Sequence, residues 1–166
     1  NEVMFRVSCI QLKSNNNIYF NLKTTEKLIY KAVKQNTDFI LTPEVSSLFS
    51  LNKKNLLKIS TSMKDDIYLN GVRKLAKKYS KWILIGSLII KIKEKLVNRS
   101  VLIDDNGKIK VIFTQGDFVS YTWPDLIFQA SQLAKASFMK GFSINTLLLF
   151  MIVYGVALVA AMKAFL

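Results

Sequence analysis

Two side chains in this sequence have the chemistry of a catalytic group. Glu44 follows Pro43 directly, at the end of the apolar run 39–42. A carboxylate that is held at the end of a strand in a mostly apolar cleft is well placed to act as a general base. The alternative is a Glu at a strand end that simply faces water. Cys9, the second candidate, carries the one thiol in the chain.

The chemistry open to Cys9 is narrow, because the chain has a single Cys and no His among its 166 residues. A single cysteine excludes an intramolecular disulfide and a cysteine-rich metal site. Without His, zinc and haem sites lose their main ligand and general-base catalysis loses its usual residue. Within a strand, a lone Cys is expected to be a small buried hydrophobe with an unactivated thiol. We therefore predict no bound cofactor and no metal.

The elements that position these residues alternate between strand and helix along residues 1–113. Alternating or unbroken apolar runs predict strands, and apolar residues at helical spacing predict amphipathic helices. The predicted strands are 5–12, 38–42, 82–90, 96–104 and 108–113, and the predicted helices are 19–34 and 67–80. Between them, a lysine-rich loop contains a little helix, and Asp105-Asn106-Gly107 predicts a turn between paired strands. This order predicts an α/β layered domain.

Four pieces of this region occur in a familiar order. They are Val7 to Leu12, Phe39 to Glu44, Ile83 to Ser87, and Asn98-Arg99-Ser100 followed by Asp105 to Ile109. From residue 4 to about 110 the chain resembles the first half of a carbon–nitrogen hydrolase (nitrilase superfamily) domain. The resemblance implies a partial α-β-β-α sandwich and a Glu-Lys-Cys triad that hydrolyses amides or nitriles through a thioester. In that triad, Glu44 matches the general base.

The other two members of the triad have no match here. The family's lysine lies shortly after the strand that ends near Phe113, and residues 112–124 contain neither Lys nor His. No Gly-x-x-x-Cys turn follows, and Cys9 cannot replace it because it falls within the predicted first strand. Covalent catalysis then lacks its nucleophile and its oxyanion-stabilising lysine, so Glu44 is predicted to be a vestigial general base. A half sandwich would also expose a sheet edge and part of an apolar face, which a partner should cover.

The second part of the chain, from residue 111, has a different composition. We predict a linker at 114–122, an amphipathic helix at 123–141 and a transmembrane helix at 142–166. The span of about 22 residues from 144 to 165 covers about 30 Å, the thickness of the hydrocarbon layer. A buried core helix of this length would need a far larger domain around it. The helix at 123–141 fits either a membrane surface or an ordinary soluble helix.

Polar and small residues suggest how this second part meets the membrane. Basic and aromatic side chains at the predicted interface are Trp123, Lys135, Lys140 and Lys163. The lysines before the span predict a cytoplasmic amino-terminal part. Small residues that could pack against another helix are Gly155, Ala157, Ala160, Ala161 and Ala164. The alternative is that Ala and Gly are simply common in membrane helices.

The formal charge of +13 lies almost entirely in residues 1–110. Basic proteins invite a nucleic-acid interpretation, because Lys and Arg neutralise phosphates. Here the lysines are single or paired and have no interleaved aromatic platform, so solvated faces are the better interpretation and nucleic acid is an unlikely partner. Attraction to an anionic membrane surface is a second alternative.

These observations predict a single-pass membrane protein that acts as a catalytically inactive accessory subunit of a larger membrane complex. Its expected partners are other transmembrane helices and the lipid bilayer. The rival hypothesis is a membrane-anchored amide hydrolase that another chain completes. Two further alternatives are a peripheral nucleic-acid binder and a chain made of two unrelated pieces.

Overall fold

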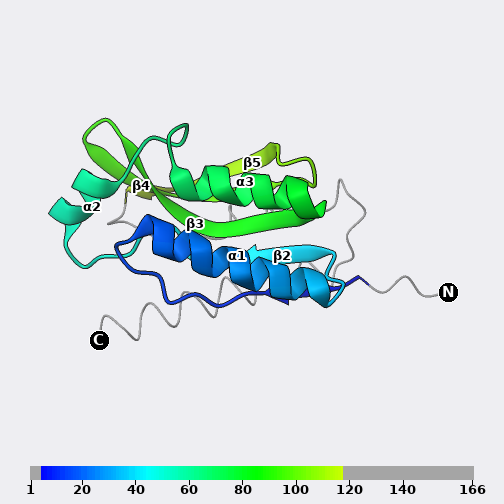
Figure 1. Ribbon diagram of the computed structural model, residues 1–166. Helices are drawn as coiled ribbons and strands as arrows, with labels where there is room; N and C mark the ends of the chain where they lie inside the picture. The colour runs from blue at the N-terminus through cyan, green and yellow to red at the C-terminus, as the bar shows by residue number, and fades with distance from the viewer. Residues whose placement is uncertain (1–4, 118–166) are drawn as a thin grey trace. The chain divides into compact units, whose positions relative to one another are not determined.

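Five strands form one mixed sheet in residues 5–117, the part of the chain that the computed structural model describes (Figure 1). They are β1 (Val7–Cys9), β2 (Phe39–Thr42), β3 (Trp82–Ile92), β4 (Lys95–Ile103) and β5 (Ile109–Asp117). Their spatial order follows the chain, β1-β2-β3-β4-β5. The first three strands are parallel, whereas β3, β4 and β5 are antiparallel neighbours. Parallel neighbours need crossover connections, and helices supply them here.

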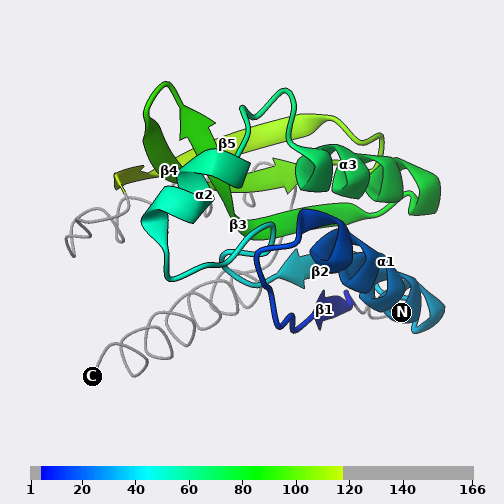
Figure 2. The same cartoon turned by 60° about the vertical axis from the view of Figure 1, so that its left-hand side comes forward.

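Three helices occupy the crossovers in this region: α1 (Ile18–Lys34), α2 (Lys53–Ile59) and α3 (Ile67–Tyr79). Each begins at a residue whose side-chain oxygen accepts a hydrogen bond from a backbone N–H in the first turn. These N-caps are Asn17, Asn52 and Asp66. Such caps satisfy an otherwise unpaired helix donor and fix where each helix starts. Figures 1 and 2 show α1 and α3 side by side on one face of the sheet.

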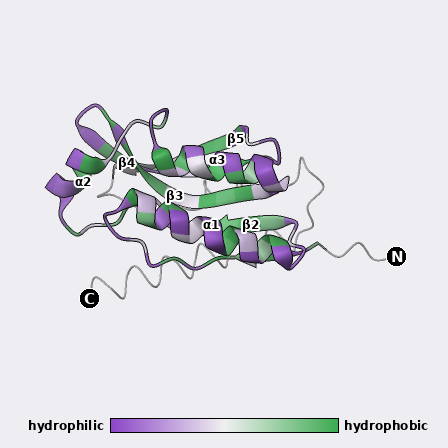
Figure 3. Ribbon diagram, in the orientation of Figure 1, coloured by the Kyte–Doolittle hydropathy of each residue, from purple (hydrophilic) through white to green (hydrophobic). Residues whose placement is uncertain are grey.

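The main core lies between that helix pair and the sheet. It combines apolar residues of α1 and α3 with one face of β2, β3 and β4. The fully buried members include Ile29, Ile40, Tyr68, Val72, Ile83, Ile85, Leu88 and Val101. A second, smaller cluster joins Leu48 and Leu56 to Ile89 and Leu96. Figure 3 shows the corresponding pattern, with hydrophobic strands and helices that alternate between apolar and polar faces.

The predicted α/β fold of the first part of the chain is confirmed, and every strand and helix predicted within residues 5–117 is present. The predicted first strand at 5–12 is too long, because only Val7–Cys9 pairs with β2. The stretch before α3 contains a seven-residue helix, α2.

The predicted membrane-spanning helix has no counterpart in the part of the chain that can be described. No helix within residues 5–117 is both long and apolar enough to cross a bilayer. The predicted linker, the amphipathic helix at 123–141 and the helix at 142–166 lie outside the described residues. The same is true of every interface and helix-packing residue named above for that part of the chain.

Candidate active site

Glu44 lies in a tight turn at the carboxyl end of β2. The strand ends at Thr42, and Pro43 then offers no N–H to continue the ladder. Glu44 is half-buried, and Val45 after it has a φ of +53°. A left-handed backbone is unfavourable for a β-branched residue, by about 1–2 kcal/mol, so surrounding contacts must hold this turn in place.

Those contacts come largely from β3. The pairing of β3 with β4 shifts register between Ile85 and Leu88, which marks a β-bulge at Gly86 and Ser87. The Val45 N–H donates to Ser87 Oγ at 2.7 Å, and the Ser46 N–H donates to the Ser87 carbonyl at 3.0 Å. Ser87 therefore satisfies both backbone donors that follow Glu44.

Gly86 allows the bulge to approach the Glu44 turn. A Cβ atom at this position would lie 2.5 Å from the Thr42 carbonyl oxygen and 2.6 Å from the Pro43 carbonyl carbon. Both neighbours are backbone atoms, so they cannot move aside as a flexible side chain would. On the next strand, Ser100 Oγ donates to the Gly86 carbonyl at 2.6 Å and ties the bulge to β4.

Three of the pieces of sequence that carry the family resemblance meet around the end of β2. Phe39 to Glu44 supplies the turn, Gly86 and Ser87 supply the bulge, and Ser100 braces it from β4. Arg99, also on β4, donates through Nε to Thr114 Oγ1 on β5 at 3.0 Å. The turn, the bulge and Ser100, which are far apart in sequence, therefore build one framework around Glu44.

Cys9 has a different environment from the one predicted. Cys9 lies on the edge strand β1, where it pairs with Leu41 of β2. Its side chain is exposed, so the prediction of a buried side chain is wrong. Its register places it on the face opposite the helices, because its neighbour Ser8 pairs with Ile40 of the main core. Partial burial raises the pKa of the Cys9 thiol above its ordinary value. A raised pKa disfavours the thiolate, which is the nucleophilic form.

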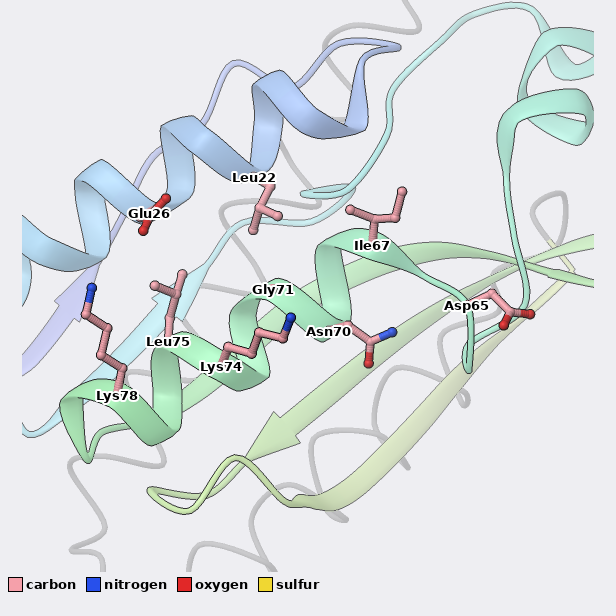
Figure 4. A pocket seen from close by; sticks show the side chains of 9 residues that line it. All are labelled: Leu22, Glu26, Asp65, Ile67, Asn70, Gly71, Lys74, Leu75 and Lys78. Atoms are coloured by element: carbon pink, nitrogen blue, oxygen red, sulfur yellow. The ribbon is translucent and has the colours of Figure 1, made fainter.

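A groove of about 480 Å³ runs between α1 and α3 (Figure 4). It is lined by Leu22, Glu26, Asp65, Ile67, Asn70, Gly71, Lys74, Leu75 and Lys78. Its lining includes neither Glu44 nor Cys9, so it is separate from the candidate site. Within residues 5–117, no group of three or more His, Cys, Asp and Glu side chains could hold a metal ion.

Sequence reasoning missed the polar residues that support the turn. Ser46 and Ser87 are both fully buried, and each makes hydrogen bonds at the Glu44 turn. The one available signal was a cluster of hydroxyl residues directly after Glu44, in a segment that otherwise resembled a loop.

Comparison with known proteins agrees with this framework. The family model for carbon–nitrogen hydrolases matches residues 6–137. The chain belongs to the carbon–nitrogen hydrolase family. A search of curated proteins gave no significant match.

Solved structures share the fold of this chain. The NitFhit protein of C. elegans has a TM-score of 0.61 at 22% identity, with 73% of this chain and 31% of that chain covered. A double mutant of the amidase from Nesterenkonia sp. AN1, in complex with acrylamide, has a TM-score of 0.60 at 16% identity. The match covers 70% of this chain and 45% of that chain. A mutant of the same amidase in complex with butyramide has a TM-score of 0.59 at 18% identity. That match covers 73% of this chain and 45% of the other. The chain therefore spans less than half the length of these structures.

Membership of this family corrects the function expected from sequence. A catalytically inactive accessory subunit of a membrane complex was predicted, and that prediction is wrong. The family match covers most of the chain, residues 6–137. The rival hypothesis, a carbon–nitrogen hydrolase, agrees better with the match.

Proposed function

We propose that this chain contributes the general base, Glu44, to a cysteine-dependent amide hydrolase. The observation that carries the proposal is the turn at the end of β2, where a half-buried carboxylate follows a strand and two hydrogen bonds to the buried Ser87 hold the residues after it. A general base must be held in one place, because proton transfer depends on its distance from the reacting group.

In the proposed reaction, the Glu44 carboxylate takes the proton from a thiol, and the thiolate attacks the amide carbonyl carbon. The C–N bond then breaks, the protonated carboxyl gives its proton to the leaving amine, and a thioester remains. Glu44 next takes a proton from water, whose oxygen attacks the thioester and releases the acid and the free thiol. One amide and one water give one acid and one amine, and no oxidant or reductant is needed.

The thiol in this scheme is not Cys9. Its raised pKa and its place on edge strand β1 both disfavour it as a nucleophile. Residues 1–166 contain no other cysteine. The nucleophile is therefore proposed to come from polypeptide outside these residues, either joined to this chain or associated with it. The amidase mutants crystallised with acrylamide and butyramide suggest small aliphatic amides as first substrates to test.

The test uses the chain isolated from its own cells through an affinity tag, together with any polypeptide joined to it or bound to it. Ammonia release from butyramide is measured for the parent chain and for Glu44→Gln, which keeps the shape but cannot accept the proton. Glu26→Gln is the matched control, because Glu26 is an exposed glutamate on α1. We expect Glu44→Gln to lower kcat by about 10²-fold or more and Glu26→Gln to leave it unchanged.

A second pair of measurements identifies the thiol. Iodoacetamide should abolish turnover, whereas Cys9→Ser should retain it. Failure of the isolated assembly to hydrolyse amides, or full activity of Glu44→Gln, would overturn the proposal. Loss of activity in Cys9→Ser would show that the assignment of the nucleophile is wrong.

A further inference from the structure

Ser87 makes three hydrogen bonds to the chain on either side of Glu44. Its N–H donates to the Pro43 carbonyl at 3.4 Å, and its carbonyl accepts from the Ser46 N–H at 3.0 Å. Its Oγ accepts from the Val45 N–H at 2.7 Å. The donor in this third bond is a backbone N–H, so the hydroxyl can only be the acceptor. One residue of β3 therefore binds the turn both before and after the candidate general base.

Only the third of these bonds depends on the side chain. Any residue except proline could supply the backbone N–H and carbonyl, whereas the bond to Val45 needs an oxygen on a short side chain. Ser87 is completely buried and lies in the β3 bulge, an irregularity that can redirect a side chain. Removing its hydroxyl would leave the Val45 N–H without this acceptor, at a position that the protein itself encloses.

Val45 is the residue of the turn that most needs such a support. Its φ of +53° is in the left-handed region, which is unfavourable for a β-branched side chain and persists only when surrounding contacts hold it. Its N–H also belongs to the planar peptide unit that joins Glu44 to Val45. Fixing the direction of this N–H therefore fixes the backbone rotation directly after the Glu44 Cα.

We propose that Ser87 is a positioning residue for Glu44. Its hydroxyl holds the peptide unit between Glu44 and Val45, and so keeps Val45 in the left-handed conformation that orients Glu44 at the end of β2. The importance of Ser87 for catalysis rests on the proposed function of Glu44, whereas its hold on the turn can be measured without any activity.

Amide hydrogen exchange, followed by NMR on the full chain, measures this hold. The probe is the Ser46 amide, because its acceptor is the Ser87 carbonyl, which survives substitution of the side chain. We expect Ser87→Ala to lower the protection factor of Ser46 by about tenfold or more. The matched control is Ser47→Ala, which should leave it near the parent value. Ser47 is also completely buried, and its Oγ accepts from the Ile89 N–H at 3.3 Å.

Glycine at position 45 tests whether the Ser87 hydroxyl acts through the strained backbone. Glycine adopts a positive φ without steric cost, so the turn should need the hydroxyl much less in Val45→Gly. Adding Ser87→Ala to Val45→Gly should therefore change the protection factor of Ser46 by less than about threefold. Both proteins in this comparison lack the valine side chain, so its lost packing cancels.

Parent protection of Ser46 in Ser87→Ala would overturn the proposal, as would an equal loss in Ser47→Ala. A loss that is as large in the glycine background as in the parent would also overturn it, because Ser87 would then not act through Val45. If far-UV circular dichroism shows that Ser87→Ala does not fold, Ser87→Cys takes its place, since sulfur is a weak acceptor. Loss of protection at Ser46 is again expected, and parent protection would again overturn the proposal.

Kinetics of the isolated hydrolase give a readout that general destabilisation would not produce. With butyramide as substrate, we expect Ser87→Ala to lower kcat by about 10- to 100-fold with KM unchanged, and Ser47→Ala to leave kcat near the parent value. Parent kcat in Ser87→Ala would overturn the positioning role even though Glu44 is catalytic. Absence of any Glu44-dependent turnover would refute the proposed function, and the exchange rates would still decide whether Ser87 holds the turn.

Discussion

At the residue scale, several positions around the end of β2 and the start of α3 carry opposing demands. Val45 adopts a left-handed backbone that costs free energy, and Ser87 supplies hydrogen bonds that hold the turn there. Gly86 brings two backbone segments closer than any side chain would allow. Asp66 begins α3 from a completely buried position.

Gly86→Ala should destabilise the fold strongly. Its Cβ would meet the Thr42 and Pro43 backbone at 2.5–2.6 Å, and overpacking against atoms that cannot yield costs about 1–3 kcal/mol. Gly71→Ala is the control, since its Cβ would meet only the Leu22 side chain, which can rotate away. Urea denaturation should show the larger loss for Gly86→Ala, and equal losses would contradict the close backbone approach.

Asp66 should make stability depend on pH. Burial raises its pKa to about 6 in the folded chain from an ordinary value of 3.8, although its Oδ1 accepts from the Leu69 N–H at 2.7 Å. Its Oδ2 is buried without a hydrogen-bond partner. The folded state therefore prefers the protonated acid. The stability that protonation contributes is complete below pH 3.8 and is lost as the pH rises through 6.

Asp66→Asn tests this dependence because it keeps an oxygen to cap α3 and cannot ionise. Relative to the parent, the variant should gain about 2–3 kcal/mol in free energy of unfolding between pH 4 and pH 7, since each pKa unit corresponds to about 1.4 kcal/mol. Asp65→Asn, at an exposed neighbour, should show no comparable gain. Urea titrations at the two pH values measure the difference, and a pH-independent difference would refute a raised pKa at Asp66.

At the scale of elements, helix ends are defined by local side chains and by backbone conformation. The N-caps of the three described helices are Asn17, Asn52 and Asp66. Asn and Asp are among the residue types most often found at N-caps. Their ends are less uniform. The C-cap of α3, Ser80, has a φ of +51°, whereas Gln35 at the end of α1 has a φ of −92°.

Ser80→Gly should stabilise the protein. Glycine adopts the left-handed conformation without steric cost, so the expected gain is about 0.5–1 kcal/mol. Gln35→Gly is the matched control at a C-cap with negative φ, where glycine only adds freedom to the unfolded chain and should lower stability. Thermal unfolding followed by circular dichroism measures both changes. A lower Tm for Ser80→Gly would contradict the left-handed cap.

At the scale of the whole molecule, a strong positive charge covers the outer face of the helix pair. The exposed lysines there are Lys23, Lys27, Lys31 and Lys34 on α1 and Lys74, Lys77 and Lys78 on α3. The chain as a whole has a net charge of +13. Like charges repel one another more in the compact state than in the unfolded chain, and salt screens that repulsion.

Lys27→Glu should therefore stabilise the chain at low salt. The new carboxylate would lie four residues from both Lys23 and Lys31, and such pairs contribute about 0.2–0.5 kcal/mol each. We also expect the Tm of the parent chain to rise with sodium chloride, and to rise less in Lys27→Glu. A Tm of the parent that falls with added salt would show that repulsion on this face is unimportant.

The sequence by itself determined the order and type of the elements in residues 5–117. The spacing of apolar residues predicts each strand and helix, and N-cap residues predict where a helix begins. Both signals lie within a few neighbouring residues. The position of Glu44 at the end of β2 was also predictable, because Pro43 stops the strand. The motifs were sufficient to assign the family, yet the missing Lys and Cys led to a wrong prediction of function.

Only the tertiary structure decided how the candidate site is built. The bonds from Val45 to Ser87 and from Thr25 to Tyr68 join residues that are 42 and 43 positions apart. No local period encodes such pairs. Strand order decided the environment of Cys9 in the same way: Cys9 lies on edge strand β1 and is exposed, whereas its partner Leu41 on the inner strand β2 is buried. The local sequence pattern determines which residues form a strand. The neighbouring strands and helices determine what each side chain of that strand contacts.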